Sequence, residues 1–497
     1  MRFNICSTKL GDLTDDAVVC YVTEIKSIRG PYLKSLNEAT DGGFLKVIEA
    51  EEFTGKNGEI VSFTRPIGLA TGRLLIVGLG DAKKLCADSF RKAMGILSRY
   101  KGFTQCKSVA LFFGDHGDAV YYQAAVEGLL LGAFKQLDYK TGDSAEDKSR
   151  LEYLSVSTGK SAWIKRAESA VERGRVIAEG QILVRELAQT PAADLTPRKY
   201  ASKVQKLARK YDFSCRILDE KAIAREKMGA FLGVSQGSEE PARFLILRYD
   251  GGRKSQKPIV LVGKGVTFDS GGISLKPGLN MHEMKQDMAG SAVVVAAITT
   301  AARLKLKQNL VGLIPATENM PSGHAIRPGD ILTSRKGKTI EIINTDAEGR
   351  LILADALDYA NEFNPQAVID IATLTGASLY ILGYAGAPIM GNNDKLLDRI
   401  SDAADVSAER VWSLPIWDDH RDQMKSPIAD LVNSGGRPAG TIAAAAFLEN
   451  FIGDWPWAHI DIAYVDAEPS GKPYIPKGAT GIGLRLLIEV ISNWKKL

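Results

Sequence analysis

The stretch Asn344-Thr345-Asp346-Ala347-Glu348-Gly349-Arg350-Leu351 places two carboxylates and a guanidinium group within five residues. The apolar run Thr339–Ile343 before it predicts a buried strand, and the Leu- and Ala-rich segment Leu351–Asn361 after it predicts a helix. Ligands of α/β proteins gather where strands end, because the loops there can direct side chains toward one point. The stretch is therefore the first candidate for a functional site.

Asp346 and Glu348 lie two residues apart, so on an extended segment their side chains can point to the same side. Two such carboxylates repel and raise each other's pKa unless a cation holds them. The simpler alternative is a solvated turn, because Asp-x-Glu arises by chance in most long chains. The pair indicates a metal site only if other ligands come from elsewhere in the chain.

The composition bounds the class of protein. Of 497 residues, 45% are hydrophobic, which is ample for a large core in two or three domains. A net charge of +4, from 63 basic and 59 acidic residues, is too balanced to favour nucleic acid or an anionic membrane as the main partner. The N-terminal stretch Met1–Cys6 does not begin a signal peptide, and no apolar run reaches membrane-spanning length. We therefore expect a soluble, cytoplasmic protein.

Cysteine and histidine usage excludes several kinds of metal site. The five cysteines are scattered without a C-x-x-C pair, which indicates free thiols rather than disulfides or a thiolate zinc site. The five histidines are scattered too, no H-E-x-x-H motif occurs, and we expect them to be structural or surface residues. A metal site in this chain would therefore use oxygen ligands, with a lysine as a further option.

The pattern of apolar runs predicts an α/β protein of two domains. Residues 1–160 alternate short apolar runs with helical stretches, which predicts a smaller N-terminal α/β domain. Residues 161–190 have few breakers and a helical apolar spacing, which predicts a long linker helix. Residues 191–497 predict a larger catalytic α/β domain, with a parallel or mixed sheet covered by helices on both faces.

A second candidate segment, Val262–Pro277, begins where a predicted strand ends, and its glycines permit tight folding around a ligand. Gly263-Lys264-Gly265 lacks the rest of a phosphate loop. Asp269-Ser270-Gly271-Gly272 resembles the nucleophile segment of trypsin-like proteases, but the one histidine that precedes it, His116, lies in the other predicted domain. We discount both interpretations.

A third candidate is Asp287, which stands just before the apolar segment Ser291–Leu304, a predicted helix. By itself it is interpreted as an N-terminal helix cap. Together with Asp269, Asp346 and Glu348 it completes a set of carboxylates drawn from three segments. Such sets suit hard or borderline divalent ions, and shared carboxylates can bridge two of them.

These three segments resemble the leucine (cytosol) aminopeptidase family, the M17 metallopeptidases. The octapeptide Asn344–Leu351 matches the family signature, while Lys264–Lys276 and Asp287 match its other site segments. The resemblance covers most of residues 190–490, and the N-terminal third matches only in general pattern. It continues through Ala372–Ala377, Gly440–Ile442, Trp457–Ala463 and Lys477–Gly481. Two segments, Gln189–Pro191 and Ile482–Gly483, depart from the family pattern without touching a proposed ligand.

The resemblance implies a role for each matching residue. Lys264 and Asp287 would hold one metal ion, Asp346 the other, and Asp269 and Glu348 would bridge both. Lys264 would need a depressed pKa, because an amine ligand must be neutral. The implied catalytic residues are Lys276, which would stabilise the oxyanion, and Arg350, which would anchor a bicarbonate that shuttles protons. The implied substrate pocket is bordered by Met284, Thr373, Leu374 and Gly376.

The resemblance also implies an activity and an assembly. We expect a leucine-preferring aminopeptidase that removes N-terminal residues from peptides through a water or hydroxide bridging two metal ions, for intracellular peptide turnover. The ions would be Mn²⁺ or Zn²⁺, with Mg²⁺ or Co²⁺ as options, and the assembly a homohexamer.

Two other functions stay open. Some bacterial relatives are reported to bind DNA, but the positive excess is too small and diffuse to indicate it here. The other is a nucleotide cofactor at Gly78-Leu79-Gly80, a weak interpretation because Lys83 stands where the third glycine belongs.

Overall fold

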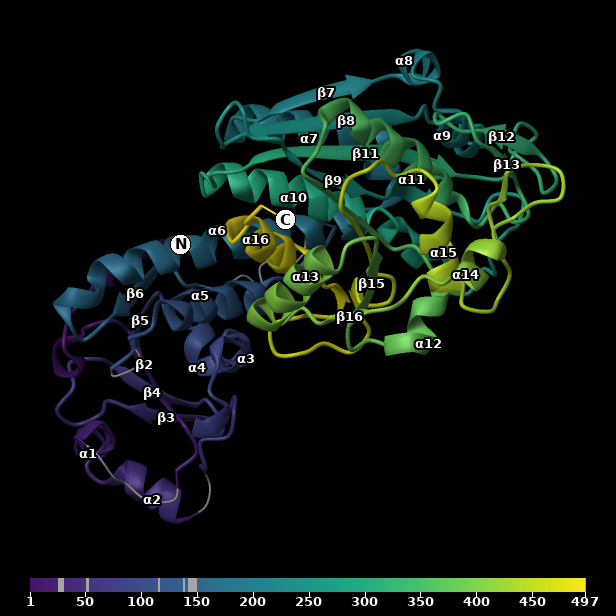
Figure 1. Cartoon of the computed structure of the whole chain (residues 1–497). Coiled ribbons are helices and arrows are strands. Elements are labelled where there is room, and N and C mark those ends of the chain that lie inside the picture. Colours follow the sequence, from purple (N-terminus) through teal and green to yellow (C-terminus); the bar gives the residue numbers. More distant parts are fainter. Residues whose placement is uncertain (26–30, 51–52, 115–116, 137–138, 142–149, 497) are drawn as a thin grey trace. The chain divides into compact units, whose positions relative to one another are not determined.

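The computed structural model describes residues 1–25, 31–50, 53–114, 117–136, 139–141 and 150–496. Within these residues the chain forms two compact units (Figure 1). The N-terminal unit comprises Met1–Glu179 and Ser470–Pro476, and the C-terminal unit comprises Gly180–Pro469 and Lys477–Leu497. The predicted fold class, a smaller and a larger α/β domain, is confirmed. None of the described helices is long and apolar enough to cross a bilayer.

The N-terminal unit is built on a six-stranded sheet in the order β1-β6-β5-β2-β4-β3, parallel except for the β3–β4 pair. Its central strands are continuous apolar runs buried on both faces, as parallel strands between helices require. The strands are β1 (Arg2–Cys6), β2 (Ala17–Val22), β3 (Ile60–Thr64), β4 (Arg73–Gly78), β5 (Ser108–Phe112) and β6 (Tyr153–Ser157). The helices are α1 (Pro31–Ala39), α2 (Gly43–Glu49), α3 (Ala87–Leu97), α4 (Lys101–Thr104) and α5 (Ala119–Ala133). A 26-residue helix, α6 (Ile164–Gln189), contains the division between the two units.

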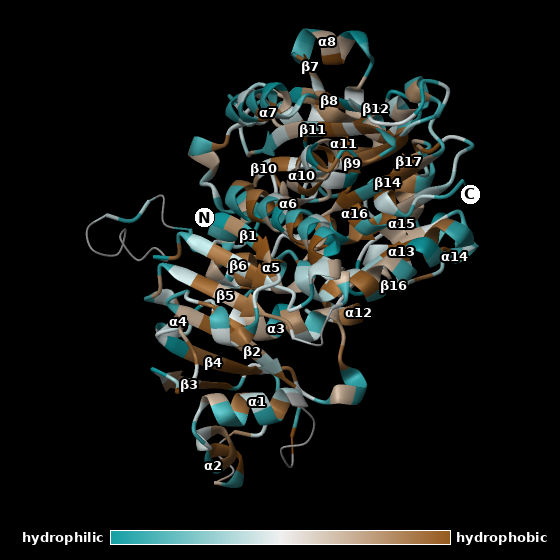
Figure 2. Cartoon of the chain, turned by 90° about the vertical axis from the view of Figure 1, so that its left-hand side faces the viewer, coloured by the Kyte–Doolittle hydropathy of each residue, from teal (hydrophilic) through white to brown (hydrophobic). Residues whose placement is uncertain are grey.

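The C-terminal unit is built on a mixed nine-stranded sheet in the order β16-β15-β18-β14-β9-β11-β8-β7, with β10 paired to β11 off this path. The four central strands β18, β14, β9 and β11 are parallel to one another. In chain order the strands are β7 (Ser214–Leu218), β8 (Arg243–Asp250), β9 (Ile259–Gly263), β10 (Gly265–Asp269), β11 (Asn309–Asn319), β14 (Ala367–Ala372), β15 (Ala387–Gly391), β16 (Val411–Ser413) and β18 (Trp457–Asp461). Figure 2 shows these central strands as hydrophobic ribbons between helices with mixed faces.

Helices cover both faces of this sheet, as the sequence predicted. Helices α9, α11 and α15 share a core with one face, and α10 packs on the other together with α7 and α16. The larger helices are α7 (Pro197–Tyr211), α9 (Gly229–Ser235), α10 (Ala289–Arg303), α11 (Glu348–Tyr359), α13 (Asp394–Ser407), α15 (Gly440–Glu449) and α16 (Leu484–Ser492). The short ones are α8 (Glu220–Arg225), α12 (Leu379–Leu382) and α14 (Asp418–Asp422). Two small sheets complete the unit: β12 (Ile331–Thr333), β13 (Thr339–Glu341) and β17 (Leu431–Val432), and β19 (Ala467–Glu468) with β20 (Gly478–Ala479).

Two local predictions around the octapeptide were wrong. Thr339–Ile343 was predicted to be a buried strand, but the strand β13 ends at Glu341, lies in a small sheet, and leaves Ile343 47% exposed. The helix predicted from Leu351 begins at Glu348, three residues earlier. The strand was misassigned because a short apolar run does not distinguish a central strand from a peripheral one. The helix begins earlier because an acidic residue such as Glu348 is stable in a first helical turn.

Close packing of α10 against the central sheet depends on glycine. A Cβ at Gly290 would lie 2.2 Å from the backbone oxygen of Ile371 in β14, and one at Gly263 would lie 2.6 Å from Cα of Ser291. Neither backbone oxygen nor Cα can move without shifting a whole element. The N-terminus of α10 is therefore pressed onto the carboxyl ends of β9 and β14, next to Asp287.

We expect Gly290→Ala to destabilise the C-terminal unit by about 1–3 kcal/mol, the usual cost of overpacking a filled core. The better helix propensity of alanine cannot offset a contact of 2.2 Å with backbone. Thermal unfolding checks this, with Gly323→Ala as control because a Cβ there meets nothing within 4 Å. Equal melting temperatures for the two variants would contradict the packing described.

Candidate active site

The carboxyl ends of β9, β10 and β14 meet at one cluster of charged side chains. Asp269 is the last residue of β10, Lys264 joins β9 to β10, and Glu348 opens α11. One carboxylate oxygen from each of Asp269, Asp346 and Glu348 lies within 4.8 Å of the other two. The structure thus brings together acidic residues that the sequence separates by almost eighty positions.

Two lysines neutralise this cluster. Lys264 Nζ lies 2.7 Å from Asp287 and 2.9 Å from Glu348, and its side chain is 4% exposed. Lys276 Nζ lies 2.8 Å from Asp269 and 2.5 Å from Asp346, with 22% of its side chain exposed. All five proposed metal ligands and one of the two proposed catalytic residues therefore lie in a single charged network.

Asp287 does not cap the helix that follows it. The N-cap of α10 is Met288, and the Asp287 carboxylate instead accepts hydrogen bonds from Lys264 Nζ at 2.7 Å and from Thr373 Oγ1 at 2.8 Å. The cap interpretation, which was the default for this residue alone, is wrong. The hydrogen bonds from Lys264 and Thr373 orient the Asp287 carboxylate toward the carboxylate cluster.

The local backbone structure that brings the Asp346 and Glu348 carboxylates together also differs from the extended segment that was predicted. Glu348 lies in the first turn of α11 rather than on an extended segment, and Ala347 between them is the N-cap residue. Gly271, with φ of 88°, lets the loop after β10 wrap around Asp346, where a Cβ would lie 2.9 Å from Asp346 Oδ1. The two carboxylates converge through this turn.

Burial and neighbouring charges shift the pKa values of the ionisable groups in this cluster. Burial raises the pKa of Asp287 well above its ordinary value, and burial together with the charge of Asp269 raises the pKa of Glu348 and Asp346. Burial alone lowers the pKa of Lys264, but the surrounding carboxylates, Asp287 first, raise it above the ordinary value. The depressed pKa expected from the sequence therefore requires that cations, rather than the amine, neutralise the carboxylates.

The donor set fits divalent cations. It consists of four carboxylates and one amine, which is the oxygen-rich chemistry that Mn²⁺, Mg²⁺ and Zn²⁺ accept. Glu348 Oε2 is buried and has no hydrogen-bond partner among the described residues. A buried carboxylate oxygen without a partner is costly, and a cation would satisfy it.

Asn319, a residue that was not predicted from the sequence, orients the cluster. It is the last residue of β11 and is 2% exposed. Its Nδ2 donates to Asp269 Oδ1 at 2.8 Å and to the Thr345 backbone oxygen at 3.1 Å. The apolar run Leu310–Ile314 predicts a strand that ends five residues before Asn319, so the sequence did not place this polar residue at a strand end.

The four residues proposed to border the substrate pocket lie in segments that adjoin the carboxylate cluster. Thr373 offers its backbone oxygen to Lys264 Nζ at 3.0 Å, and the Leu374 amide donates to Asp461 Oδ1 at 3.0 Å. Gly376 begins a 3₁₀ turn, and a Cβ there would lie 3.8 Å from Tyr464 Oη. Met284 lies in the 3₁₀ turn Met281–Gln286 that leads into Asp287.

Arg350 is held beside the cluster rather than in it. Its Nη1 donates to the Asn433 backbone oxygen at 2.8 Å, while its Nε is buried without a partner among the described residues. Burial lowers the pKa of Arg350 to about 10, although Glu348 and Asp461 favour its charged form. The guanidinium therefore retains donors that a small anion could use.

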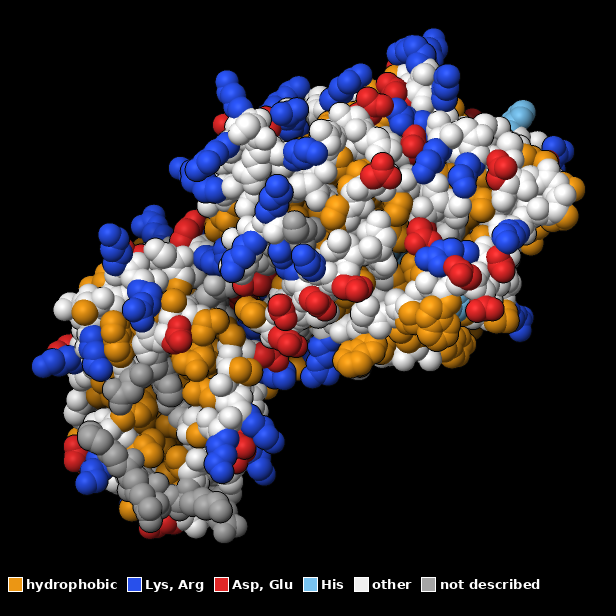
Figure 3. Space-filling model, viewed as in Figure 1, with side chains coloured by type: hydrophobic (Ala, Val, Ile, Leu, Met, Phe, Trp, Pro, Cys, Tyr) orange, Lys and Arg blue, Asp and Glu red, His pale blue; other side chains and the backbone are white. Residues whose placement is uncertain are grey.

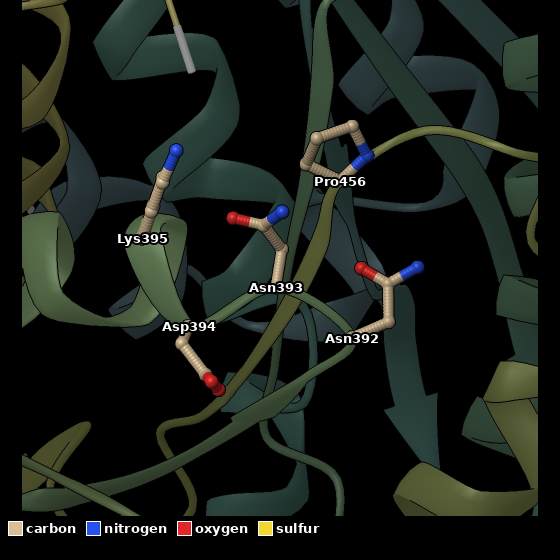
Figure 4. A pocket seen from close by; sticks show the side chains of 5 residues that line it. All are labelled: Asn392, Asn393, Asp394, Lys395 and Pro456. Atoms are coloured by element: carbon tan, nitrogen blue, oxygen red, sulfur yellow. The ribbon is translucent and has the colours of Figure 1, made fainter.

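A pocket of 550 Å³ elsewhere in the same unit contains none of these residues (Figure 4). It is lined by Asn392, Asn393, Asp394, Lys395 and Pro456. Two of its amide groups are already committed: Asn392 bonds the backbone of Trp455 and Trp457, and Asn393 caps α13. It offers no chemistry that competes with the carboxylate cluster.

Comparison with known proteins identifies the family. Residues 182–488 match the cytosol aminopeptidase family catalytic domain, and residues 18–143 match the N-terminal domain of that family. The chain is 44% identical over 467 residues to a probable cytosol aminopeptidase of Syntrophotalea carbinolica, covering 93% of this chain and 94% of that one. It is 43% identical over 482 residues to one of Geotalea uraniireducens, covering 96% of each.

Solved structures show the same fold. A mutant of tomato leucine aminopeptidase superposes with a TM-score of 0.88 at 31% identity, covering 99% of this chain and 96% of that one. The bottromycin maturation enzyme BotP in complex with Mn superposes with a TM-score of 0.84 at 32% identity, covering 96% and 99%.

Fold and site together define an α/β aminopeptidase of two domains. The chain belongs to the cytosol aminopeptidase family, the M17 peptidases, as its sequence suggested.

We expect Asn319→Ala to lower the affinity for Mn²⁺ about 10- to 100-fold, the usual effect of removing a group that orients a ligand. Asp269 Oδ1 would lose the amide donor of Asn319 while every proposed ligand stays in place. Competition with a chromogenic chelator measures the affinity. Asn450→Ala is the matched control, because its side-chain amide also donates to a backbone oxygen and contacts a charged side chain, Lys338, but none of these residues is a proposed ligand. Equal Mn²⁺ affinity in both variants would show that Asn319 does not orient the site.

Proposed function

We propose that this aminopeptidase is metal-dependent and removes leucine and similar apolar residues from the N-terminus of peptides. The observation that carries the proposal is the buried cluster of Asp269, Asp346 and Glu348, completed by Asp287 and Lys264. The ions would be Mn²⁺ or Zn²⁺, with Mg²⁺ or Co²⁺ as options, since such ligands accept all of them. Peptides with a free N-terminus would be the substrates, in intracellular peptide turnover in the cytoplasm.

The five ligands would share two ions. Lys264 and Asp287 would hold one ion, Asp346 the other, and Asp269 and Glu348 would bridge them. Two ions at this place would supply Lewis-acid activation of a water and of the scissile carbonyl. Asn319 and Thr373 keep Asp269 and Asp287 in orientation, so that little reorganisation is needed when a substrate binds.

Lys276 would donate a hydrogen bond to the oxyanion of the tetrahedral intermediate. Of the two lysines it is the accessible one, with 22% of its side chain exposed against 4% for Lys264. A positioned cationic donor of this kind contributes about 3–4 kcal/mol of transition-state stabilisation. Lys264 is too enclosed for that role and fits that of a ligand.

Arg350 would hold a bicarbonate that moves protons between water and leaving group. Its buried Nε without a partner supports an anion beside the cluster. The substrate side chain would lie against Met284, Thr373, Leu374 and Gly376. Leu374 packs against the hydrophobic core and Met284 is half-buried, so this border favours apolar side chains.

We also propose that the enzyme works as a homohexamer. Large aromatic side chains stand in solvent on the C-terminal unit: Tyr380 is 89% exposed, Trp412 67% and Trp417 61%. Figure 3 shows hydrophobic side chains gathered over α12, which contains Tyr380. Exposed aromatic groups of this size are typical of surfaces that pack against another chain.

The direct test is hydrolysis of leucyl-p-nitroanilide by the purified protein loaded with Mn²⁺. We expect activity that a chelator abolishes and that Mn²⁺ restores, because ions held by these ligands would activate the attacking water. Metal content per chain is measured alongside. Full activity after complete removal of metal would contradict the proposal, as would inactivity of the loaded protein.

Variants separate metal ligation from oxyanion stabilisation. We expect Lys264→Ala, Asp346→Ala and Glu348→Ala each to lose bound metal and activity. Lys276→Ala should retain the metal and lose about 10²–10³-fold in kcat, the loss typical of one oxyanion donor. Metal analysis and kinetics on the same preparations check both statements. A Lys276→Ala enzyme with full turnover would remove its proposed role.

A further inference from the structure

A tyrosine with a strained backbone lies beside the proposed substrate pocket. Tyr464 is in the segment that follows β18, and its φ of 67° is in the left-handed region that bulky aromatic residues rarely adopt. Such a conformation persists only where surrounding contacts hold it, and it is found most often at functional sites. The contacts around Tyr464 therefore indicate what its side chain does.

Asp461 and Ser378 hold the segment that leads into Tyr464. The buried Asp461 carboxylate accepts hydrogen bonds from the Ala463 amide at 3.1 Å and from the Leu374 amide at 3.0 Å. Ser378 Oγ donates to the Ala463 backbone oxygen at 3.1 Å. The residue before Tyr464 is thereby bound, on both sides of its backbone, to the segment that contains the proposed pocket residue Leu374.

The Tyr464 side chain bounds an open space at Gly376, another proposed pocket residue. A Cβ built on Gly376 would lie 3.8 Å from Tyr464 Oη. Apart from the two residues adjacent in the chain, no other heavy atom of the described part of the protein comes within 4 Å of that position. Glycine thus leaves room at the border of the pocket, and the Tyr464 hydroxyl is the group that limits this room.

A second tyrosine supports the Tyr464 ring. Tyr384 and Tyr464 meet edge to face, with ring centroids 6.2 Å apart and an interplanar angle of 84°. Tyr464 is 37% exposed and Tyr384 is 48% exposed, so both rings border solvent. Aromatic pairs of this geometry are favourable beyond the area that they bury, so the Tyr464 ring is held in place although it is partly exposed.

The Tyr464 phenol also lies within range of the proposed oxyanion-stabilising residue. Burial raises the pKa of Tyr464, nearby phenol groups add to this rise, and the positive charge of Lys276 opposes it. The ring is therefore close enough to Lys276 to interact with its charge, and it contacts the position beside Gly376. The space that Tyr464 bounds belongs to the active site rather than to a remote surface.

We propose that Tyr464 is a specificity-determining residue, whose phenol limits the size of the N-terminal side chain that the aminopeptidase accepts. The inference rests on the proposed function, in which Gly376 borders that side chain, and it assigns the outer boundary of the pocket. A leucine side chain fits beside Gly376, whereas the bicyclic ring of tryptophan meets the Tyr464 hydroxyl. Glycine at position 464 would avoid the backbone strain but would leave the pocket open.

The test is the ratio of kcat/KM for tryptophanyl-p-nitroanilide to kcat/KM for leucyl-p-nitroanilide, measured on the Mn²⁺-loaded enzyme. Tyr464→Gly removes the ring and suits the left-handed backbone, so the variant should fold. We expect it to raise the ratio about tenfold or more, the size of effect that a few atoms in a pocket have on discrimination. Tyr464→Ala should shift the ratio in the same direction, and Tyr464→Phe, which keeps the ring, should shift it much less.

Ala408→Gly is the matched control. Ala408 also has a positive φ, 57°, at the C-cap of α13, and it is neither a proposed ligand nor a proposed pocket residue. Glycine there relieves the same kind of backbone strain without removing a side chain from the pocket. Its ratio should equal that of the wild-type enzyme, which separates removal of the Tyr464 ring from relief of strain.

An unchanged ratio in both Tyr464→Gly and Tyr464→Ala would overturn the inference. A lower ratio in these variants would overturn it as well, because the ring would then bind large side chains instead of excluding them. Failure of the proposed function would be seen separately, as a metal-loaded wild-type enzyme that does not hydrolyse leucyl-p-nitroanilide.

Discussion

The confinement of four carboxylates in a buried space is the constraint on which the C-terminal unit depends. Asp269, Asp287 and Glu348 are each less than a tenth exposed, and Asp346 is only partly exposed. Like charges so close cannot all ionise unless positive charge is supplied within a few ångströms. Two lysines supply half of it, and a buried carboxylate oxygen is left without a partner. The site is therefore built to gain free energy when divalent cations bind.

The topology makes this confinement possible. The central strands β18, β14, β9 and β11 are parallel, so their carboxyl ends lie at one edge of the sheet. Three of these strands contribute to the cluster at their carboxyl ends: Lys264 follows β9, Thr373 follows β14, and Asn319 is the last residue of β11. The glycine at position 290 then lets α10 approach closely enough to hold Asp287 beside them. A rigid sheet thus positions groups that would otherwise repel one another.

Much of this could be predicted from the sequence. The alternation of apolar runs predicted the two-domain α/β fold, and motifs in three segments predicted which family the chain belongs to. The residues that those motifs single out as ligands do come together, because the motifs record chemistry and not secondary structure. Local structure was predicted less well. The helix α11 begins early enough to include Glu348, and a strand, β10, separates Lys264 from Asp269.

What escaped prediction are the residues that act through tertiary contacts. Asn319 lies five residues beyond the predicted strand end, and nothing local in the sequence connects it to Asp269. The pairing of His459 with Asp370 was not predicted either, because it depends on the register of two strands almost ninety residues apart. Such roles depend on which strands are neighbours, which one sequence alone does not specify.

The most direct test of the metal site is anomalous diffraction from crystals of the protein grown with Mn²⁺. We predict two manganese peaks enclosed by Asp269, Asp287, Asp346 and Glu348, with Lys264 Nζ turned onto one ion and Lys276 released from the carboxylates. A map without manganese in this cluster, in which both lysines still neutralise the carboxylates at high Mn²⁺ concentration, would contradict this prediction.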